Sequence, residues 1–198
     1  MPARRDTLLT MRCAFPDPPL VAADIVLRRP SADDVPWITA ACSDRELSRY
    51  IPAIPYPYSQ SDARAFVERA VRGWAEGTGA TFVIEHALTG EDWGTIGLQL
   101  FPYDAALAEV GYWLRREARG RGAATTAVRL VSNWAFEKLG IQRMNLMTAP
   151  ENVASQRVAG RAGFTREGLL RAWMPTSNGR RDSVMFSLLA TDPSRLSF

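Results

Sequence analysis

A short stretch rich in glycine and arginine, Arg119-Gly120-Arg121-Gly122-Ala123-Ala124, lies between an apolar run at 110–114 and a helix-forming run at 125–139. This order predicts a strand, a tight turn and a helix in succession. Because glycine has no Cβ, Gly120 and Gly122 allow consecutive backbone N–H groups to close around an anion. The following helix adds its unpaired N–H groups and the positive end of its dipole. The stretch therefore predicts a pyrophosphate-binding turn.

Two common phosphate-binding loops do not fit this stretch. A Walker A loop ends in Gly-Lys followed by Ser or Thr, but the only lysine of the chain, Lys138, lies well downstream. A dinucleotide-binding fingerprint needs a third glycine three residues after the second, and Thr125 occupies that position. The pattern that matches is Arg or Gln, two residues, Gly, one residue, and Gly or Ala. Arg119, Gly122 and Ala124 satisfy it.

The flanking segments carry further motifs. Asn152 opens a helix-forming stretch that ends at Gly163-Phe164, and residues 108–114 have the sequence Ala-Glu-Val-Gly-Tyr-Trp-Leu. On these motifs the chain resembles the GNAT N-acetyltransferases, in particular the RimJ/RimL-like group that acetylates the N-termini of ribosomal proteins. The resemblance covers roughly Ile25 to Ala190, a normal length for one domain. It implies an α/β (α+β) GNAT fold, in which a mostly antiparallel mixed sheet of about six or seven strands is flanked by about four helices.

The resemblance also implies acetyl-CoA as cosubstrate, coenzyme A as product and direct attack of a primary amine on the thioester. It assigns the pyrophosphate to the turn and the start of its helix, namely Arg119, Gly120, Arg121, Gly122, Ala123, Ala124 and Thr125. In the resembled family the strand before the turn splays from its neighbour, which would free the backbone amides of Tyr112, Trp113 and Leu114 for the acetyl and pantetheine groups. Asn152 is the implied partner of the pantetheine and also suits a helix N-cap.

Glu109 and Ser155 are the candidate catalytic residues. Acetyl transfer needs a base for the ammonium and an acid for the departing thiolate. The resemblance implies Glu109 as the base, acting directly or through water. The alternatives are a glutamate that faces solvent or one that only holds a neighbouring backbone in place, because a shift of one residue reverses the side of a strand to which a side chain points. Many GNAT enzymes use as acid a tyrosine at the position held here by Ala159, and the resemblance implies Ser155 instead. A serine that only binds a backbone donor at the helix start is the alternative.

In the resembled fold, the early helices, the loop between them and the last strand pair build the acceptor cleft. This implies substrate contacts from Tyr50, the proline-rich loop 52–58, Trp173 and Met174. The set is aromatic and has no acidic cluster, which disfavours a polycationic acceptor such as an aminoglycoside. We expect a peptide or protein N-terminus as acceptor. The alternatives are a small amine, an amino acid or an antibiotic, or a domain that binds acyl-CoA without catalysis.

Composition limits the other classes of function. The net charge is only +3, and all 24 basic residues except Lys138 are arginines scattered along the chain, so no nucleic-acid partner is expected. No run is long and apolar enough for a signal peptide or a membrane span, so no membrane partner is expected. Cys13 and Cys42 lie far apart and His86 is the only histidine, which predicts neither a metal site nor a disulfide framework. The expected compartment is the cytoplasm.

A length of 198 residues predicts one domain. We expect a loosely ordered extension over 1–22, the GNAT domain over 23–192 and a tail over 193–198, in a monomer or homodimer. Helices are predicted from Ser31, from Ser59 or Ser61, over 125–139 and after Asn152. The second of them has an apolar stripe of Ala63, Phe66, Val67, Ala70, Val71 and Trp74. Strands are predicted over 25–29, 80–87, 93–101, a segment ending at 114, 143–148, 168–173 and 183–189, with a turn at 176–179 between the last two.

Overall fold

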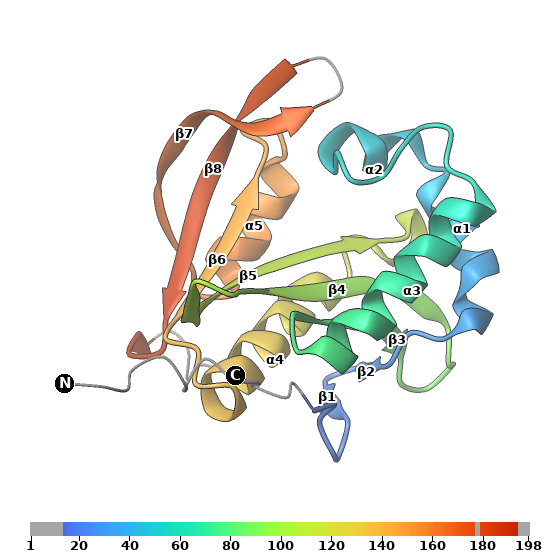
Figure 1. Ribbon diagram of the computed structural model, residues 1–198, viewed down its shortest axis with the longest axis horizontal. Helices are drawn as coiled ribbons and strands as arrows, with labels where there is room; N and C mark the ends of the chain where they lie inside the picture. The colour runs from blue at the N-terminus through green and yellow to red at the C-terminus, as the bar shows by residue number, and fades with distance from the viewer. Residues whose placement is uncertain (1–13, 177–178, 194–198) are drawn as a thin grey trace, which may run out of the picture.

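The computed structural model describes residues 14–176 and 179–193, and within them an eight-stranded sheet forms the centre of the molecule (Figure 1). The strand order is β1-β2-β3-β4-β5-β6-β8-β7. All neighbouring strands are antiparallel except β5 and β6, which are parallel. The strands are β1 (Leu20–Ala22), β2 (Ile25–Arg28), β3 (Gly79–His86), β4 (Asp92–Phe101), β5 (Asp104–Leu114), β6 (Arg143–Thr148), β7 (Thr165–Thr176) and β8 (Gly179–Leu189).

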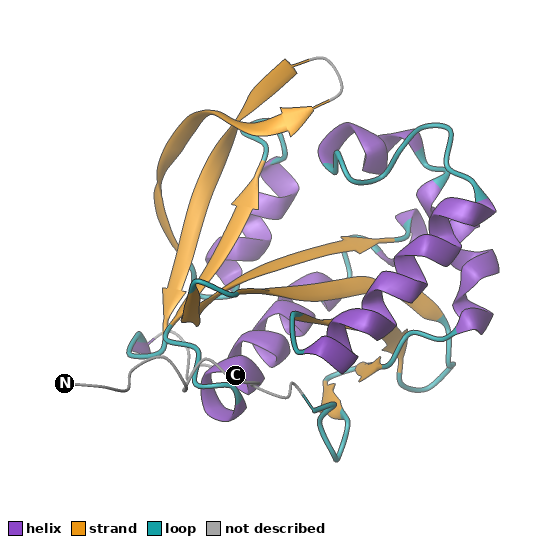
Figure 2. Ribbon diagram, in the orientation of Figure 1, coloured by secondary structure: helices purple, strands orange, loops and turns teal. Residues whose placement is uncertain are grey.

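Helices cover both faces of this sheet (Figures 1 and 2). The α-helices are α1 (Val35–Cys42), α2 (Arg45–Tyr50), α3 (Gln60–Glu76), α4 (Ala123–Lys138) and α5 (Val153–Arg161), and two 3-10 turns are η1 (Ala32–Asp34) and η2 (Arg116–Ala118). On one face α3 packs on β3 and α1 packs on α3, whereas on the other face α4 packs on β1, β2, β4 and β5 while α5 packs on β6 and β7. The predicted fold class is confirmed, with eight strands and five α-helices in the described residues instead of about six or seven strands and about four helices.

Side chains of β5 divide the core between the two faces. Val110 and Leu114 belong to the larger apolar cluster with α4, and Trp113 belongs to a second cluster with α1 and α3. This is the alternation expected of a strand covered on both sides. It fixes the register of β5, the strand on which the predicted base and acetyl-binding residues lie.

Helix α3 follows its prediction closely. Ser59 is its N-cap and forms a capping box with Asp62, and the helix ends at Gly77, which has a φ of +67°. One residue of the predicted stripe was wrong: Val71 is 53% exposed. Val71 follows the buried Ala70 directly in sequence but lies on the exposed side of the helix.

Three features of the fold differ from the sequence-based expectations. Helix α4 begins at Ala123, two residues before the predicted start, and α2 and β1 were not predicted. The predicted extension lies outside the described residues over 1–13; within its remainder, Phe15 packs on Trp74 and β1 pairs with β2. Residues 177–178 of the predicted last turn and most of the predicted tail also lie outside the described residues.

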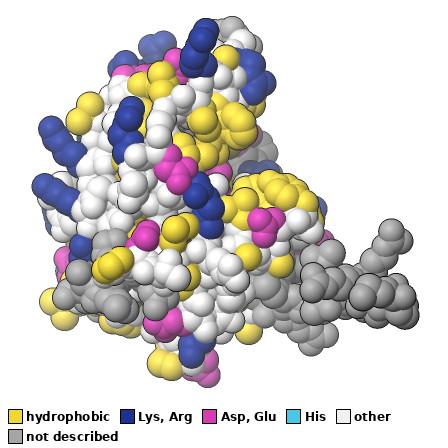
Figure 3. All heavy atoms as spheres, turned by 90° about the vertical axis from the view of Figure 1, so that its left-hand side faces the viewer, with side chains coloured by type: hydrophobic (Ala, Val, Ile, Leu, Met, Phe, Trp, Pro, Cys, Tyr) yellow, Lys and Arg dark blue, Asp and Glu magenta, His cyan; other side chains and the backbone are white. Residues whose placement is uncertain are grey.

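The face that carries β7 and β8 shows how the basic residues are distributed (Figure 3). Basic side chains there stand apart from one another, with acidic and apolar side chains between them. In this region Arg143 pairs with Glu167 at 2.7 Å, and Arg180 donates to backbone carbonyls of β7.

Candidate active site

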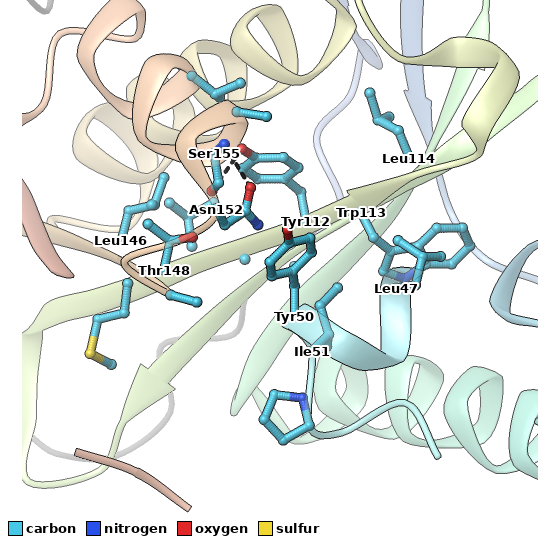
Figure 4. Close-up of a pocket in the computed structure, with 18 of the residues that line it drawn as sticks. Leu47, Tyr50, Ile51, Tyr112, Trp113, Leu114, Leu146, Thr148, Asn152 and Ser155 are labelled. Carbon is cyan, nitrogen blue, oxygen red and sulfur yellow. Dashed lines mark hydrogen bonds between the residues drawn. The ribbon is translucent and has the colours of Figure 1, made fainter. Parts of the chain in front are cut away.

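Strands β5 and β6 separate from each other and leave an opening in the sheet. Their parallel pairing covers only 107–109 and 143–145 and ends at the pair of Glu109 and Asn145. Both strands continue beyond this point, β5 to Leu114 and β6 to Thr148, without pairing with each other. A pocket of about 450 Å³ lies at the opening, and both strands, α2 and the start of α5 line it (Figure 4).

The backbone of β5 presents alternate groups to this opening. Arg115 N–H donates to the Trp93 carbonyl of β4 at 2.8 Å. Since backbone groups alternate in direction along a strand, the Trp113 backbone also faces β4, whereas those of Tyr112 and Leu114 face the opening. Of the three predicted amides, that of Trp113 therefore faces β4 and not the opening. Trp113 lines the pocket with its buried side chain instead.

The turn after β5 is shaped for an anion. Gly120 and Gly122 have φ of +78° and +86°, and a Cβ at either position would meet nothing within 4 Å. Gly122 is the N-cap of α4 and has no side chain that could accept the helix N–H groups. The first helical turn also contains no acidic residue. The backbone N–H groups of Ala123, Ala124 and Thr125 in that first turn thus remain available. This geometry fits a pyrophosphate.

The two arginine side chains of the turn point to protein partners. Arg119 Nη1 lies 2.6 Å from a Glu46 carboxylate oxygen, and Arg119 Nη2 lies 3.0 Å from Asp44. Arg116 joins the same group, with Nη2 3.1 Å from Asp44. The Arg121 guanidinium lies over the Trp93 ring at 5.5 Å. The turn therefore offers its backbone to a ligand, while Arg119 and Arg116 hold α2 in place.

Asn152, Ser155 and Tyr112 form a hydrogen-bonded group at the opening (Figure 4). Asn152 is the N-cap of α5, and its Oδ1 accepts the Ser155 N–H at 3.1 Å. The Tyr112 hydroxyl donates to Ser155 Oγ at 3.1 Å. All three residues line the pocket. Burial raises the pKa of the Tyr112 phenol to about 12, so it stays protonated at neutral pH.

Glu109 lies beside the pocket but does not line it. It is on the same strand face as Gly111, two residues further along, where β5 and β4 place Gly111 opposite Gly97. This glycine pair, Gly97 and Gly111, lines the pocket without side chains. Burial raises the pKa of the Glu109 carboxyl above its ordinary value. Its carboxylate has no hydrogen-bond or ion-pair partner in the described part of the chain.

The acceptor side contains two of the three predicted substrate residues. Tyr50 and Met174 line the pocket, whereas Trp173 is 49% exposed and does not. Sequence reasoning missed Arg181 of β8, which lines the pocket and donates to the carbonyls of Arg49 at 2.8 Å and of Tyr50 at the end of α2. It also missed the glycine pair, which the register of the β4–β5 hairpin would have revealed.

Among the described residues, no cluster of three His, Cys, Asp or Glu side chains could hold a metal ion. His86 stacks on Trp93 and shares a 2.7 Å hydrogen bond with Thr89, away from the pocket. None of the described helices is long and apolar enough to cross a membrane.

Comparison with known proteins identifies a family. A model of the acetyltransferase (GNAT) domain matches residues 24–165. An uncharacterized N-acetyltransferase of Bacillus licheniformis, p20, is 30% identical over 165 residues, which cover 83% of this chain and 92% of p20.

Two solved structures share the fold. RimL, a ribosomal L7/L12 α-N-protein acetyltransferase in complex with coenzyme A, superposes with a TM-score of 0.77 at 22% identity, covering 85% of this chain and 96% of RimL. The microcin C7 self-immunity acetyltransferase MccE, in complex with acetyl-CoA and AMP, gives 0.76 at 19% identity, covering 85% and 93%. At these identities the likeness concerns the fold alone.

Proposed function

The chain belongs to the GNAT acetyltransferase family, and from that premise we propose that it moves the acetyl group of acetyl-CoA to the N-terminal amine of a peptide or protein. It is an acyltransferase of the N-acetyltransferase type. The observation that carries the proposal is the continuity of the anion-binding turn with the opening between β5 and β6. The related fold of RimL holds coenzyme A and that of MccE holds acetyl-CoA, which supports the choice of cosubstrate.

The residues around the opening fit the parts of acetyl-CoA. The turn at 119–122 and the first turn of α4 would hold the pyrophosphate through backbone N–H groups. The backbone of Tyr112 and Leu114, together with the Asn152 side chain, would hold the pantetheine arm, whose amides need hydrogen-bonding partners. When bound, acetyl-CoA supplies an activated acyl group whose thioester is open to attack by an amine.

Proton transfer falls to Glu109 and Ser155 in this proposal. Glu109 accepts a proton from the incoming ammonium, directly or through water. Burial raises the pKa of the Glu109 carboxyl and so brings it closer to the pKa of the ammonium that it deprotonates. Ser155 donates to the departing thiolate. The glycine pair beside Glu109 leaves space for the amine to approach the sheet, because neither residue has a side chain there.

Charge around the pocket favours an acceptor with a single amine. The lining residues with charged side chains are Glu46, Arg119 and Arg181. Glu46 is already paired with Arg119, so no unpaired carboxylate among the lining residues attracts a polycation. An α-amine has a pKa near about 8, whereas a lysine side chain is near about 10.4, so an N-terminus is the easier group to deprotonate.

Mass spectrometry of acetylated products tests this proposal. The protein is incubated with acetyl-CoA and pairs of peptides of the same sequence, one with a free N-terminus and one with a blocked N-terminus and an internal lysine. A polyamine and an aminoglycoside are included for comparison. We expect acetylation of the free N-terminus. Acetylation confined to the small amines or to lysine side chains would refute the acceptor assignment, and loss of transfer without acetyl-CoA checks the donor.

A further inference from the structure

Position 159 provides no acid to the reaction. Ala159 is fully buried in the larger apolar cluster, and its methyl group cannot give a proton. Ser155, one helical turn earlier, has a hydroxyl, but an isolated aliphatic hydroxyl is a poor acid at neutral pH. A second group that stabilises the serine oxygen as it loses its proton would remove this difficulty.

The side chain of Tyr112 is placed for that task. It comes from β5, on the opposite side of the opening from the body of α5, and its hydroxyl donates to Ser155 Oγ at 3.1 Å (Figure 4). Asn152 Oδ1 accepts the backbone N–H of Ser155 at 3.1 Å and so fixes the start of α5 at this residue. Because Ser155 Oγ accepts a hydrogen bond from the Tyr112 hydroxyl, the proton of the serine itself is free to be donated into the pocket.

We propose that Tyr112 is a positioning residue that acts through Ser155, so that the two hydroxyls together protonate the departing sulfur. As the amine nitrogen bonds to the acyl carbon, the C–S bond breaks and its electron pair leaves on sulfur. Ser155 gives its proton to that sulfur, while the Tyr112 hydroxyl stabilises the negative charge that develops on Oγ. The nitrogen, which attacked as a neutral amine, releases one proton to water, and water returns one proton to Ser155. The nitrogen loses one proton and the sulfur gains one, so the step is balanced. The proposal rests on the proposed function.

The surroundings of Tyr112 support this role. Its ring packs against the larger apolar cluster, which holds the phenol in one orientation. The phenol pKa of about 12 keeps the hydroxyl a donor over the whole range in which acetyl transfer is assayed. The pair is therefore independent of pH in that range, unlike a general acid with a pKa near neutrality.

The pKa of the coenzyme A thiol bound to the protein tests the proposal without any acceptor. The thiolate is followed by its ultraviolet absorbance in a pH titration of the complex. Hydroxyl donors near the sulfur favour the thiolate, so we expect the thiol pKa to rise in both Tyr112→Phe and Ser155→Ala. Tyr103→Phe is the matched control, because Tyr103 is 76% exposed in the turn between β4 and β5.

Turnover of the acetylated peptide gives the second readout. Removing a hydrogen bond to a charged group predicts a fall in kcat of roughly 10- to 100-fold for Tyr112→Phe, with unchanged affinity for acetyl-CoA. The double variant with Ser155→Ala should be no slower than Ser155→Ala alone, since the two hydroxyls act as one unit. A merely structural role for Tyr112 would instead give additive losses.

The outcomes separate this inference from the proposed function. If Ser155→Ala raises the thiol pKa and Tyr112→Phe leaves it at the wild-type value, the role of Tyr112 is refuted and the proposed function stands. If neither variant changes the thiol pKa, the sulfur does not lie at this pair and both the inference and the assignment of Ser155 fall. If coenzyme A and acetyl-CoA do not bind at all, the proposed function itself fails.

Discussion

Gly94 on β4 allows this strand to approach β5 closely beside the pocket, and its replacement by alanine tests this close packing. A Cβ at Gly94 would lie 2.1 Å from the Trp113 carbonyl oxygen and 2.9 Å from Leu114 Cα. Both are backbone atoms, so β4 and β5 must move apart to accept the methyl group. Overpacking of this kind costs about 1–3 kcal/mol, which lowers the melting temperature of a domain of this size by about 2–12 °C.

Gly111→Ala is the matched control, because the same substitution is made in the neighbouring strand. A Cβ there would meet nothing within 4 Å. Alanine in a strand is about 0.5–1 kcal/mol more favourable than glycine, so Gly111→Ala should keep or slightly raise the melting temperature. Its methyl group enters the pocket, however, and should raise KM for the acceptor. Thermal unfolding followed by circular dichroism measures both variants. Equal melting temperatures for Gly94→Ala and the wild type would refute the packing argument.

Two further substitutions test the site. Glu109→Gln should slow transfer and remove the acidic limb of the pH–rate profile. It should also raise thermal stability at neutral pH. Burial raises the pKa of Glu109 in the folded state, so the wild type loses stability as pH rises through that pKa and the carboxyl ionises. An unchanged pH–rate profile would exclude Glu109 as the base. Asp44→Asn combined with Glu46→Gln should loosen α2 and raise KM for the acceptor. Because the double variant releases Arg119 from both carboxylates, the affinity for acetyl-CoA measured by calorimetry should be unchanged or higher. A fall in that affinity would contradict this arrangement.

Local patterns predicted much of the fold. The strand at 143–148 and the cap at Ser59 depend on neighbouring residues, and the structure places both as expected. Gly120 and Gly122 likewise have the positive φ that their turn requires. These features follow from periodicity and turn chemistry within a few residues.

Contacts between distant segments could not be predicted in this way. Helix α2 has only six residues, too few to form a stable helix alone. It is held by Arg119, more than seventy positions away, and by Arg181, more than one hundred and thirty positions from Arg49. The opening between β5 and β6 likewise depends on where their pairing stops, which no local pattern encodes.

In the candidate site, too, the sequence predicted the local elements but not the contacts between distant segments. The motif at 108–114 indicated the strand and Asn152 indicated the helix, but the sequence assigned Tyr112 only a backbone role. Its hydroxyl meets Ser155 across forty-three positions of sequence, and only the packing of α5 against the sheet brings them together.

Thermal unfolding with and without acetyl-CoA tests directly whether the turn and the opening bind this cosubstrate. At about a hundred times its dissociation constant, a ligand adds about 2.7 kcal/mol of stability, which predicts a rise in melting temperature of about 5–10 °C. Gly122→Asp places a carboxylate in the anion-binding turn and should abolish the rise. Gly90→Asp is its matched control: Gly90 also has a positive φ, +68°, and a Cβ there would meet nothing within 4 Å. We expect a full rise for the wild type and Gly90→Asp and none for Gly122→Asp. No rise in the wild type, or an equal rise in all three proteins, would show that acetyl-CoA does not bind at this turn.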